Sequence, residues 1–511
     1  MPSSYLNNPA RSGRAQDNAA VAMFGIVLLG FALRAALLSA NRFHPDESLY
    51  ASFALKIADA RDVWLSHEVV DKSPLAFYLG AAALNMLGAK ARYNIFMSEL
   101  ALRLPALAAS TVSIALAAAC ARKLHSAQAG LFAGLLLALS PLAISFGATL
   151  FMDALLSCAL LASLLLVLRG HWAWSGCAFA AAYACKQSAL VFAPLVLTLG
   201  VLVQLAAPGP NSRGQQLRNW ITPLLVVLAA VYFWDYVRAA PIGFWAQGYA
   251  DNMPGRFIRP AELLPRWQQL AGLGAAVTGA PALNALLLAY CIWLPLSSMR
   301  SNPQPLQTTI SMVILGFIVA YLAGHWLLAF NLYDRYLVPL APLIIILLAQ
   351  PLAAAAGLLQ GYGPARVMRA GAVAGTAVLL TLLPASLRAS ASGYALGGDH
   401  GAYDGIEKVA AALRSAPTGS VLYDQWLDWQ WKFYLDHSPA YIGWVQGPQN
   451  LAADLRAFGA SSPRYFVAPS WEPMAEMRSA ITDAGFACVP LLDTVRRDGS
   501  RSFTLYQLVA D

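Results

Sequence analysis

The sequence predicts an α-helical polytopic membrane protein with a small C-terminal α/β domain. Of its 511 residues, 58% are hydrophobic and only 12% are charged. The mean hydropathy is +0.55, and these values exclude an ordinary soluble domain. Apolar stretches continue to about residue 390 and then give way to alternating helix-like and strand-like patterns.

The first apolar stretch, residues 18–40, is about as long as the ~20 residues needed to cross a bilayer. It is also longer than a signal-peptide core, so we expect an uncleaved first span. Arg11 and Arg14 precede it, and basic residues favour the cytoplasmic side. Residues 1–18 are therefore expected to be a cytoplasmic tail, and residues 41–74 an extracytoplasmic loop.

Further basic residues are expected to mark the cytoplasmic face: Lys90, Arg92, Arg122, Lys123, Arg169, Arg213, Arg218, Arg300, Arg366 and Arg369. Keeping them on one side requires about thirteen crossings, within a range of about eleven to thirteen, and leaves the C-terminus outside. Residues 90–120 must then cross twice, with the turn near the "RLP" of residues 103–105, because proline breaks helices. A single helix here would change the total number of crossings and the side of the membrane assigned to every later segment.

Residues 19–390 are thus expected to form the membrane module, with a second extracytoplasmic loop at residues 237–275. In residues 391–511 the helical pattern "DGIEKVAAALR" alternates with the strand-like runs "SVLYD", "RYFVAP" and "FTLYQLV". This alternation predicts a soluble α/β domain. The number of crossings places the domain on the periplasmic, extracytoplasmic side.

The first outer loop is unusually acidic, with six acidic residues between positions 44 and 75. Pro45 suits the first turn of a helix, and Asp46 and Glu47 favour the positive end of its dipole. This helix would align Asp46 and Tyr50 along one side, in the membrane interface. Adjacent carboxylates point about 100° apart, so only one of the pair can readily face a substrate. The alternative is a solvated helix start without a catalytic role.

Several other charged residues border apolar runs. Lys72 opens the second span, in "VVDKSPLAFYLGAAALN", where a lysine either reaches the interface or binds a phosphate. Arg103, Asp153, Lys186 and Arg335 lie near the same predicted face. A charge at mid-helix costs roughly 2.5 to 3.5 kcal/mol, so such residues are usually paired, interfacial or functional. Arg34 is expected to pair within the helix bundle.

The aromatic-rich loop at residues 232–267 is explained by an interfacial belt, although Arg256 and Arg259 could contact an acceptor there. No metal site is predicted. The six cysteines form no CxxC pair, and the spacing of the histidines, among them His44, His67 and His325, does not suggest a ligand set.

Six motifs occur in a characteristic order: the acidic pair after the first span, "DKSPLAFYL", "ELALRLPAL", "FMDALL", "CKQSALVFAPL" and "YDRYLVPLAPL". Together they resemble the GT-C superfamily of membrane glycosyltransferases. The similarity is to family 39 and its bacterial relatives: the aminoarabinose transferase of lipid A, protein O-mannosyltransferases and RgtA/B/C/D-like enzymes. It covers about residues 20–355. Ser73 stands where many relatives have proline, and Asp71 where the aminoarabinose enzyme has glutamate.

The resemblance implies a bacterial inner-membrane enzyme that moves a sugar, with inversion, from a polyprenyl-phosphate carrier to an extracytoplasmic acceptor. The acceptor could be lipid A, another glycolipid, a polysaccharide or a protein. Asp46 would be the general base, and Glu47 would support it through Arg103. Lys72, Arg335 and Lys186 would bind the donor phosphate, with Asp153 and Tyr50 in supporting roles. No cofactor or nucleotide-sugar pocket is implied, although the resemblance leaves open whether a divalent metal binds near Asp71.

Two other function classes fit the composition. A transporter or flippase of lipid-linked sugars would also need buried charges, but it predicts mid-span charges and paired half-sequence repeats. The charges here cluster at span ends. An envelope scaffold protein would need neither the acidic pair nor a lysine at the membrane edge.

Overall fold

The computed structural model describes residues 9–88, 94–206, 212–253, 255–298, 306–357 and 364–511. The chain divides into two compact units. The helical unit comprises residues 1–37, 64–76 and 104–397, and the sheet unit comprises residues 38–63, 77–103 and 398–511. Of the residues predicted to mark the cytoplasmic face, Lys90, Arg92 and Arg300 lie outside the described residues.

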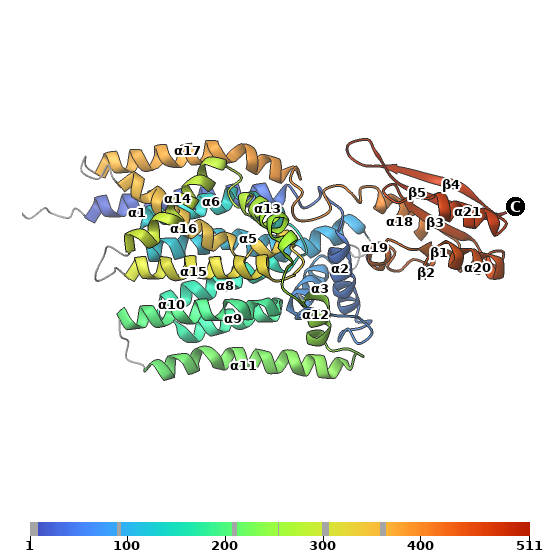
Figure 1. Cartoon of the computed structure of the whole chain (residues 1–511), viewed down its shortest axis with the longest axis horizontal. Helices are drawn as coiled ribbons and strands as arrows, with labels where there is room; N and C mark the ends of the chain where they lie inside the picture. The colour runs from blue at the N-terminus through green and yellow to red at the C-terminus, as the bar shows by residue number, and fades with distance from the viewer. Residues whose placement is uncertain (1–8, 89–93, 207–211, 254, 299–305, 358–363) are drawn as a thin grey trace, which may run out of the picture. The chain divides into compact units, whose positions relative to one another are not determined.

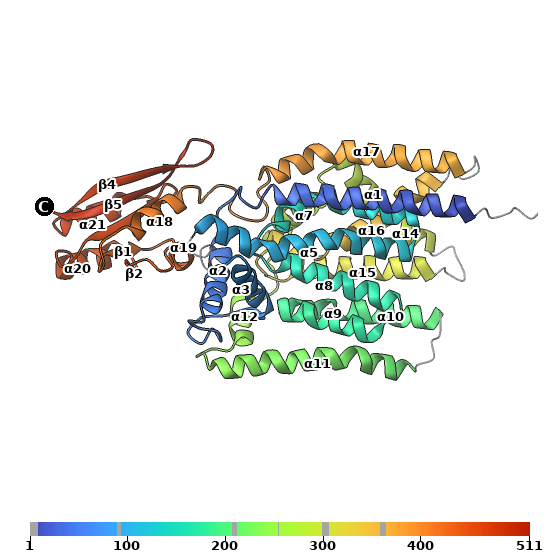
Figure 2. The ribbon, with the colours of Figure 1, turned by 180° about the vertical axis from the view of Figure 1, so that it is seen from behind.

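The helical unit is built from long apolar helices and short connecting ones (Figures 1 and 2). In chain order they are α1 (Pro9–Ala35), α6 (Ala127–Leu139), α7 (Pro141–Gly147), α8 (Asp153–Leu168), α9 (Trp172–Cys185), η1 (Gln187–Phe192), α10 (Ala193–Ala206), α11 (Arg213–Arg238), α12 (Phe244–Asn252), η2 (Pro260–Glu262), α13 (Leu263–Ala275), α14 (Pro281–Ser298), α15 (Leu306–Leu327), η3 (Asp334–Leu337), α16 (Ala341–Gly357) and α17 (Pro364–Ser390). Two further helices, α3 (Leu75–Met86) and α5 (Ile95–Leu124), contribute residues to both units.

Neighbouring helices of the helical unit pack closely. Helix α9 packs against α8 and α11, and α6 packs against α1 and α16. A Cβ at Gly176 would lie 2.3 Å from the carbonyl oxygen of Trp220, so glycine is required where α9 meets α11. Small residues that allow backbones to approach are typical of helix contacts in membranes.

Within the described residues, seven helices are long and apolar enough to cross a membrane, or eight if the pair α6 and α7, bent by 59°, forms one span. Three shorter apolar helices, Leu75–Met86, Asp153–Leu168 and Ala341–Ala356, accompany them. Helices suit this environment because they satisfy their own backbone hydrogen bonds. The predicted polytopic helical class is confirmed, whereas the number of crossings stays a prediction.

One local expectation is wrong. Residues 95–124 do not turn back near position 103 but form the continuous helix α5, with Pro105 inside it. Proline removes one backbone donor, and a long apolar helix packed against neighbours can accommodate that loss. The assignment of sides based on two crossings here therefore no longer holds for the segments that follow.

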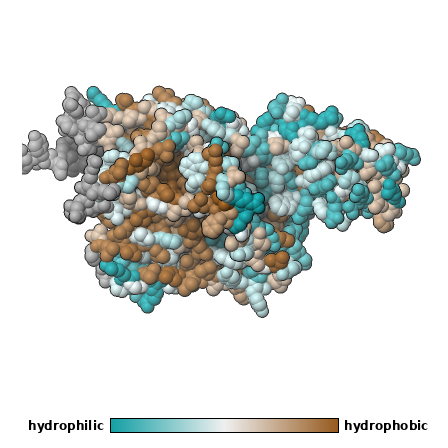
Figure 3. All heavy atoms as spheres, viewed as in Figure 1, coloured by the Kyte–Doolittle hydropathy of each residue, from teal (hydrophilic) through white to brown (hydrophobic). Residues whose placement is uncertain are grey.

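The surface of the helical unit is strongly apolar. Figure 3 shows mainly brown atoms over its helices and mainly teal atoms over the strands of the sheet unit. On α1, Val21 is 71% exposed and Phe24 is 65% exposed. Exposed apolar side chains along a span are expected where lipid covers the helix. The chain is a multi-pass membrane protein.

The sheet unit holds a five-stranded mixed sheet in the order β2-β1-β3-β5-β4. Its elements are α2 (Pro45–Ala58), α18 (Ile406–Arg414), β1 (Val421–Asp424), α19 (Asp428–Tyr434), β2 (Tyr441–Trp444), α20 (Pro448–Phe458), β3 (Arg464–Pro469), α21 (Ala475–Asp483), β4 (Phe486–Val495) and β5 (Arg501–Ala510). Strand β1 is parallel to β2 and β3, and β5 is antiparallel to β3 and β4. Tyr423, Phe466 and Leu451 lie in its core. The predicted C-terminal α/β fold is confirmed.

Helix α2 belongs to this sheet unit and packs against α19. Phe53 is buried and makes an edge contact with Phe77, their ring centroids 5.2 Å apart. The acidic turn, which we define as residues 41–47, is therefore supported by the same unit that contains the C-terminal sheet.

Candidate active site

The acidic turn begins α2 with a reciprocal cap. The Nδ1 atom of His44 accepts a hydrogen bond from the backbone N–H of Asp46 at 3.2 Å, and the Glu47 carboxylate accepts one from the backbone N–H of His44 at 3.1 Å. Pro45 occupies the first helical turn, as predicted. The cap orients the two neighbouring carboxylates differently. Asp46 is half-buried, whereas Glu47 is fully buried.

The structure brings together Glu47 and Arg103, the two residues that the family resemblance links. The Nε atom of Arg103 lies 3.7 Å from Oε1 of Glu47, and both side chains are buried. Arg103 also donates hydrogen bonds to the carbonyl oxygens of Leu38, Asn41 and Arg42, at 2.8, 2.9 and 3.2 Å. Its guanidinium therefore fixes the chain that leads into the acidic turn.

A second buried carboxylate, Glu99, was not recognised from the sequence. It lies one helical turn before Arg103 on α5, so the i,i+4 spacing of opposite charges could have indicated it. Arg42 donates from Nη1 to Glu99 at 2.5 Å, and the Tyr434 hydroxyl donates to the other carboxylate oxygen at 2.6 Å. Burial, with the nearby Glu99 charge, raises the pKa of Tyr434 well above its ordinary value.

Asp399 is a third buried carboxylate of this unit. One of its oxygens accepts a hydrogen bond from the backbone N–H of Tyr403 at 3.1 Å, and it interacts electrostatically with Arg103 and Glu47. Burial raises its pKa to about 6, although backbone hydrogen bonds partly oppose this shift. Asp399 was not recognised from the sequence, because its position depends on the loop before α18.

The helical unit contains a separate group of cations around one cavity, which we call the cation cavity. Its volume is about 280 Å³. Lys72, Lys186 and Arg335 line it together with Asp153, and aromatic side chains form much of the remaining wall: Phe192, Trp245, Tyr249, Tyr321, Phe330 and Tyr336. Three predicted phosphate-binding residues thus meet at one place. Among the described lining residues, cations outnumber carboxylates.

The cations of the cavity are held by specific partners. The Nζ atom of Lys186 lies 2.7 Å from Oδ1 of Asp153, and Lys72 pairs with Asp71. The guanidinium of Arg335 lies over the Tyr333 ring, 4.8 Å from its centroid. These contacts orient the cations, and cations near aromatic rings suit binding of an oxyanion next to an apolar chain.

Gln187 positions the segment that carries Lys72. Its amide nitrogen donates to the carbonyl oxygen of Asp71 at 2.6 Å, and its amide oxygen accepts from the backbone N–H of Ser73 at 3.3 Å. Gly248 lies against the same segment, since a Cβ there would be 2.7 Å from the Asp71 carbonyl oxygen. Neither role was predicted, because both contacts join segments distant in sequence.

Three other predicted residues have local roles. Arg256 forms an exposed ion pair with Glu262 at 2.7 Å, and the backbone N–H of Arg259 donates to the same carboxylate at 2.7 Å. Neither arginine lines the cation cavity. Arg34 is buried and donates to the Ser110 hydroxyl and to helix carbonyl groups, so hydrogen bonds satisfy it within the bundle.

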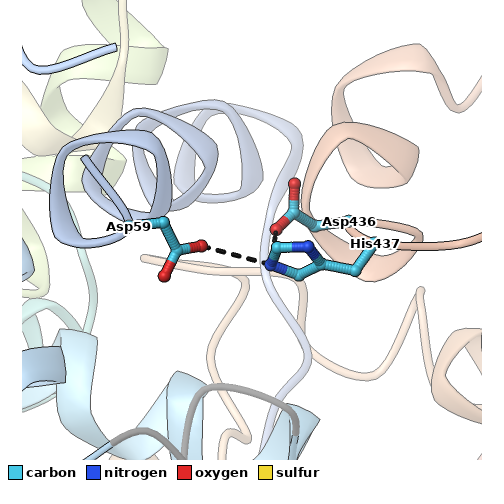
Figure 4. Close-up of side chains that lie close together, drawn as sticks. All are labelled: Asp59, Asp436 and His437. Carbon is cyan, nitrogen blue, oxygen red and sulfur yellow. Dashed lines mark hydrogen bonds and ion pairs between the residues drawn. The ribbon is translucent and has the colours of Figure 1, made fainter. Parts of the chain in front are cut away.

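One cluster in the sheet unit combines ligand types that metals use. Asp59, Asp436 and His437 lie together in Figure 4, with His437 3.1 Å from Asp59 and 3.0 Å from Asp436. Arg61 donates to both carboxylates, at 3.2 Å and 2.7 Å. The guanidinium offsets part of this negative charge, and the four side chains form an ion-pair network. Asp71, the position left open for a metal, pairs with Lys72.

The chain resembles known proteins in part of its sequence and in its fold. The family described as dolichyl-phosphate-mannose-protein mannosyltransferase matches residues 71–234. ArnT from Cupriavidus metallidurans in the apo state has a TM-score of 0.63 and 15% identity, over 96% of this chain and 98% of that chain. ArnT bound to undecaprenyl phosphate has a TM-score of 0.61 and 16% identity, over 96% and 97%. The oligosaccharyltransferase of Archaeoglobus fulgidus in the apo form has a TM-score of 0.54 and 12% identity, over 95% and 74%. A search of the curated proteins found no match.

The chain has the GT-C glycosyltransferase fold. The GT-C fold predicted from the motifs is therefore confirmed. The family match includes Lys72, Asp153 and Lys186, whereas Asp46 and Arg335 lie outside the matched residues. The chemical roles of these residues remain proposals.

Proposed function

We propose that this GT-C protein is an inverting glycosyltransferase that uses a polyprenyl-phosphate-linked sugar. The cation cavity supports this proposal most directly, because Lys72, Lys186 and Arg335 converge beside aromatic walls. A lipid phosphate needs cations for its head and apolar contacts for its chain. ArnT, which has the same fold, has been solved bound to undecaprenyl phosphate.

In the proposed reaction, the acceptor hydroxyl oxygen attacks the anomeric carbon of the sugar. The bond between that carbon and the phosphate oxygen breaks, and its electron pair leaves with the polyprenyl phosphate. Asp46 takes the proton of the hydroxyl, and the cations of the cavity stabilise the charge that develops on the phosphate. A positioned base contributes about 10² to 10⁴ in rate, and aimed cations contribute comparably.

We place the reaction at the outer face of the bacterial inner membrane. This location keeps the donor within the bilayer and lets an envelope acceptor reach the acidic turn. Lipid A, another glycolipid, a polysaccharide or a protein could supply the hydroxyl. Mass spectrometry of envelope lipids and glycans with and without the protein would identify the acceptor.

The proposal is tested with purified protein in proteoliposomes that contain undecaprenyl-phosphate-linked sugar and an envelope lipid extract. We expect release of undecaprenyl phosphate together with a glycosylated product. Lys72→Met and Arg335→Met should each raise the donor KM about tenfold or more. Lys123→Met, at the end of α5 and outside the cation cavity, is the matched control. Movement of intact donor across the membrane without cleavage would instead identify a flippase.

A further inference from the structure

The acidic turn donates a hydrogen bond to a residue nearly four hundred positions away in sequence. The backbone N–H of Phe43 donates to the Tyr434 hydroxyl at 2.8 Å, across a separation of 391 residues. Tyr434 lies at the end of α19, within the C-terminal part of the sheet unit. We propose that Tyr434 is a positioning residue, which holds the acidic turn so that the carboxylate of Asp46 is correctly aimed. This inference rests on the proposed function of Asp46.

The hydroxyl of Tyr434 accepts one hydrogen bond and donates another. It accepts from Phe43 and donates to Oε1 of Glu99 at 2.6 Å. Glu99 in turn accepts from Arg42 through its other oxygen, at 2.5 Å. Two consecutive residues of the acidic turn are thus tied to one carboxylate, one directly and one through the tyrosine hydroxyl.

The Phe43 side chain adds a packing contact to this network. It is fully buried, its ring centroid lies 4.9 Å from that of Phe433, and the guanidinium of Arg103 lies 4.7 Å above its ring. Arg103 also binds the carbonyl groups of Asn41 and Arg42. The carbonyl oxygens of Asn41 and Arg42 and the backbone N–H of Phe43 are therefore all bonded to buried partners, and such hydrogen bonds restrict the movement of the turn.

The position of this network explains how it can influence chemistry without contacting substrate. Asp46 follows Phe43 by three residues and is oriented by the cap at His44. A shift of the preceding backbone moves the cap and the carboxylate together. Since a misplacement of about 1 Å can reduce a rate about 10²-fold, loss of one fixing bond should be visible in turnover. Binding of donor lipid in the cation cavity should be unaffected.

The test compares Tyr434→Phe with Tyr423→Phe in the full-length protein. Tyr423 is also a buried tyrosine of the sheet unit whose hydroxyl donates to a carboxylate, that of Asp454, so it is a matched control. We expect Tyr434→Phe to lower kcat about tenfold with donor KM unchanged, and Tyr423→Phe to leave both within twofold. Glu99→Gln should lower kcat similarly, and the double variant should be no worse than the single ones, because both act through one network.

A second measurement does not depend on activity. Hydrogen–deuterium exchange of peptides covering residues 41–47 should be at least tenfold faster in Tyr434→Phe than in the wild type, and unchanged in Tyr423→Phe. Normal turnover with wild-type exchange would overturn the positioning role, even if Asp46→Asn abolishes transfer. If the wild type transfers no sugar, the proposed function fails. Faster exchange of residues 41–47 in Tyr434→Phe would then still support the structural part of the inference, and unchanged exchange would overturn it. If Tyr434→Phe does not fold, Glu99→Gln carries both measurements.

Discussion

The ammonium group of Lys186 lies 2.7 Å from Oδ1 of Asp153, and both side chains are buried beside the cation cavity. Lys186 stands where α9 ends and η1 begins, in an extended backbone conformation that interrupts the helix. The pair therefore holds a buried cation at the cavity, on a fixed element of the fold.

Removing one partner of this pair should be more harmful than removing both. Asp153→Asn leaves a buried ammonium without its counter-charge, which costs about 3 to 5 kcal/mol. We expect a clearly lower Tm for Asp153→Asn, and partial recovery in Asp153→Asn/Lys186→Met. Thermal unfolding in detergent measures both. Equal Tm values for the wild type and Asp153→Asn would show that the ion pair does not contribute to stability.

Gln187→Leu should weaken donor binding without changing the cations themselves. The substitution removes both hydrogen bonds that hold the segment of Lys72, at the Asp71 carbonyl and the Ser73 N–H. We expect the donor KM to rise about tenfold, because a released lysine loses its preorganisation. An unchanged donor KM in Gln187→Leu would contradict this role.

Substituting two glycines by alanine distinguishes the effect of a close contact from the effect of helix propensity. Gly248→Ala would place a Cβ 2.7 Å from the Asp71 carbonyl oxygen, whereas Gly272→Ala in α13 meets nothing within 4 Å. We expect Gly248→Ala to raise the donor KM severalfold by displacing the Lys72 segment. Gly272→Ala should be neutral or slightly stabilising, by up to about 1 kcal/mol. Similar kinetics for the two variants would argue against the contact.

The buried carboxyl group of Asp399 predicts a pH-dependent stability. Burial raises its pKa from 3.8 to about 6, so the folded chain retains this proton at pH values where the unfolded chain has lost it. Stability should therefore fall as pH rises from about 4 to above 6, by roughly 3 kcal/mol when the group is fully ionised. Asp399→Asn should reduce this decline in Tm. Burial also raises the pKa of Asp424 to about 6. Asp424 should therefore account for the pH-dependent decline that is left in Asp399→Asn. An identical pH dependence in Asp399→Asn and wild type would contradict the prediction.

The sequence predicted the parts of the fold that depend on local pattern. The strand-like runs at residues 420–424, 464–469 and 503–509 correspond to β1, β3 and β5. Strand β2 was missed because Gly443 weakens its strand pattern, and β4 because Pro490 interrupts its pattern at the edge of the sheet. The double crossing at residues 90–120 was wrong because proline was given too much weight as a helix breaker in an apolar segment.

The candidate site was predictable where charge stood out from apolar surroundings. Lys72, Lys186 and Arg335 were recognised on that basis, as were Asp46, Glu47 and Arg103. Tyr434 was not recognised, because its partner Glu99 lies 335 residues away and nothing in the local sequence distinguishes it from a core aromatic residue. Gln187 was missed for the same reason. Contacts of this range depend on the tertiary fold, which single-sequence patterns do not specify.

The most direct test of the account is sugar transfer by Asp46→Asn in proteoliposomes with a polyprenyl-phosphate-linked donor. Asp62→Asn, in the segment that follows α2, serves as the matched control. We expect the wild type and Asp62→Asn to release polyprenyl phosphate and form product at equal rates. Asp46→Asn should fold normally, bind donor normally and lose at least about 10²-fold in kcat. Near-normal turnover in Asp46→Asn would contradict the central claim that this carboxylate is the base of a lipid-linked sugar transferase.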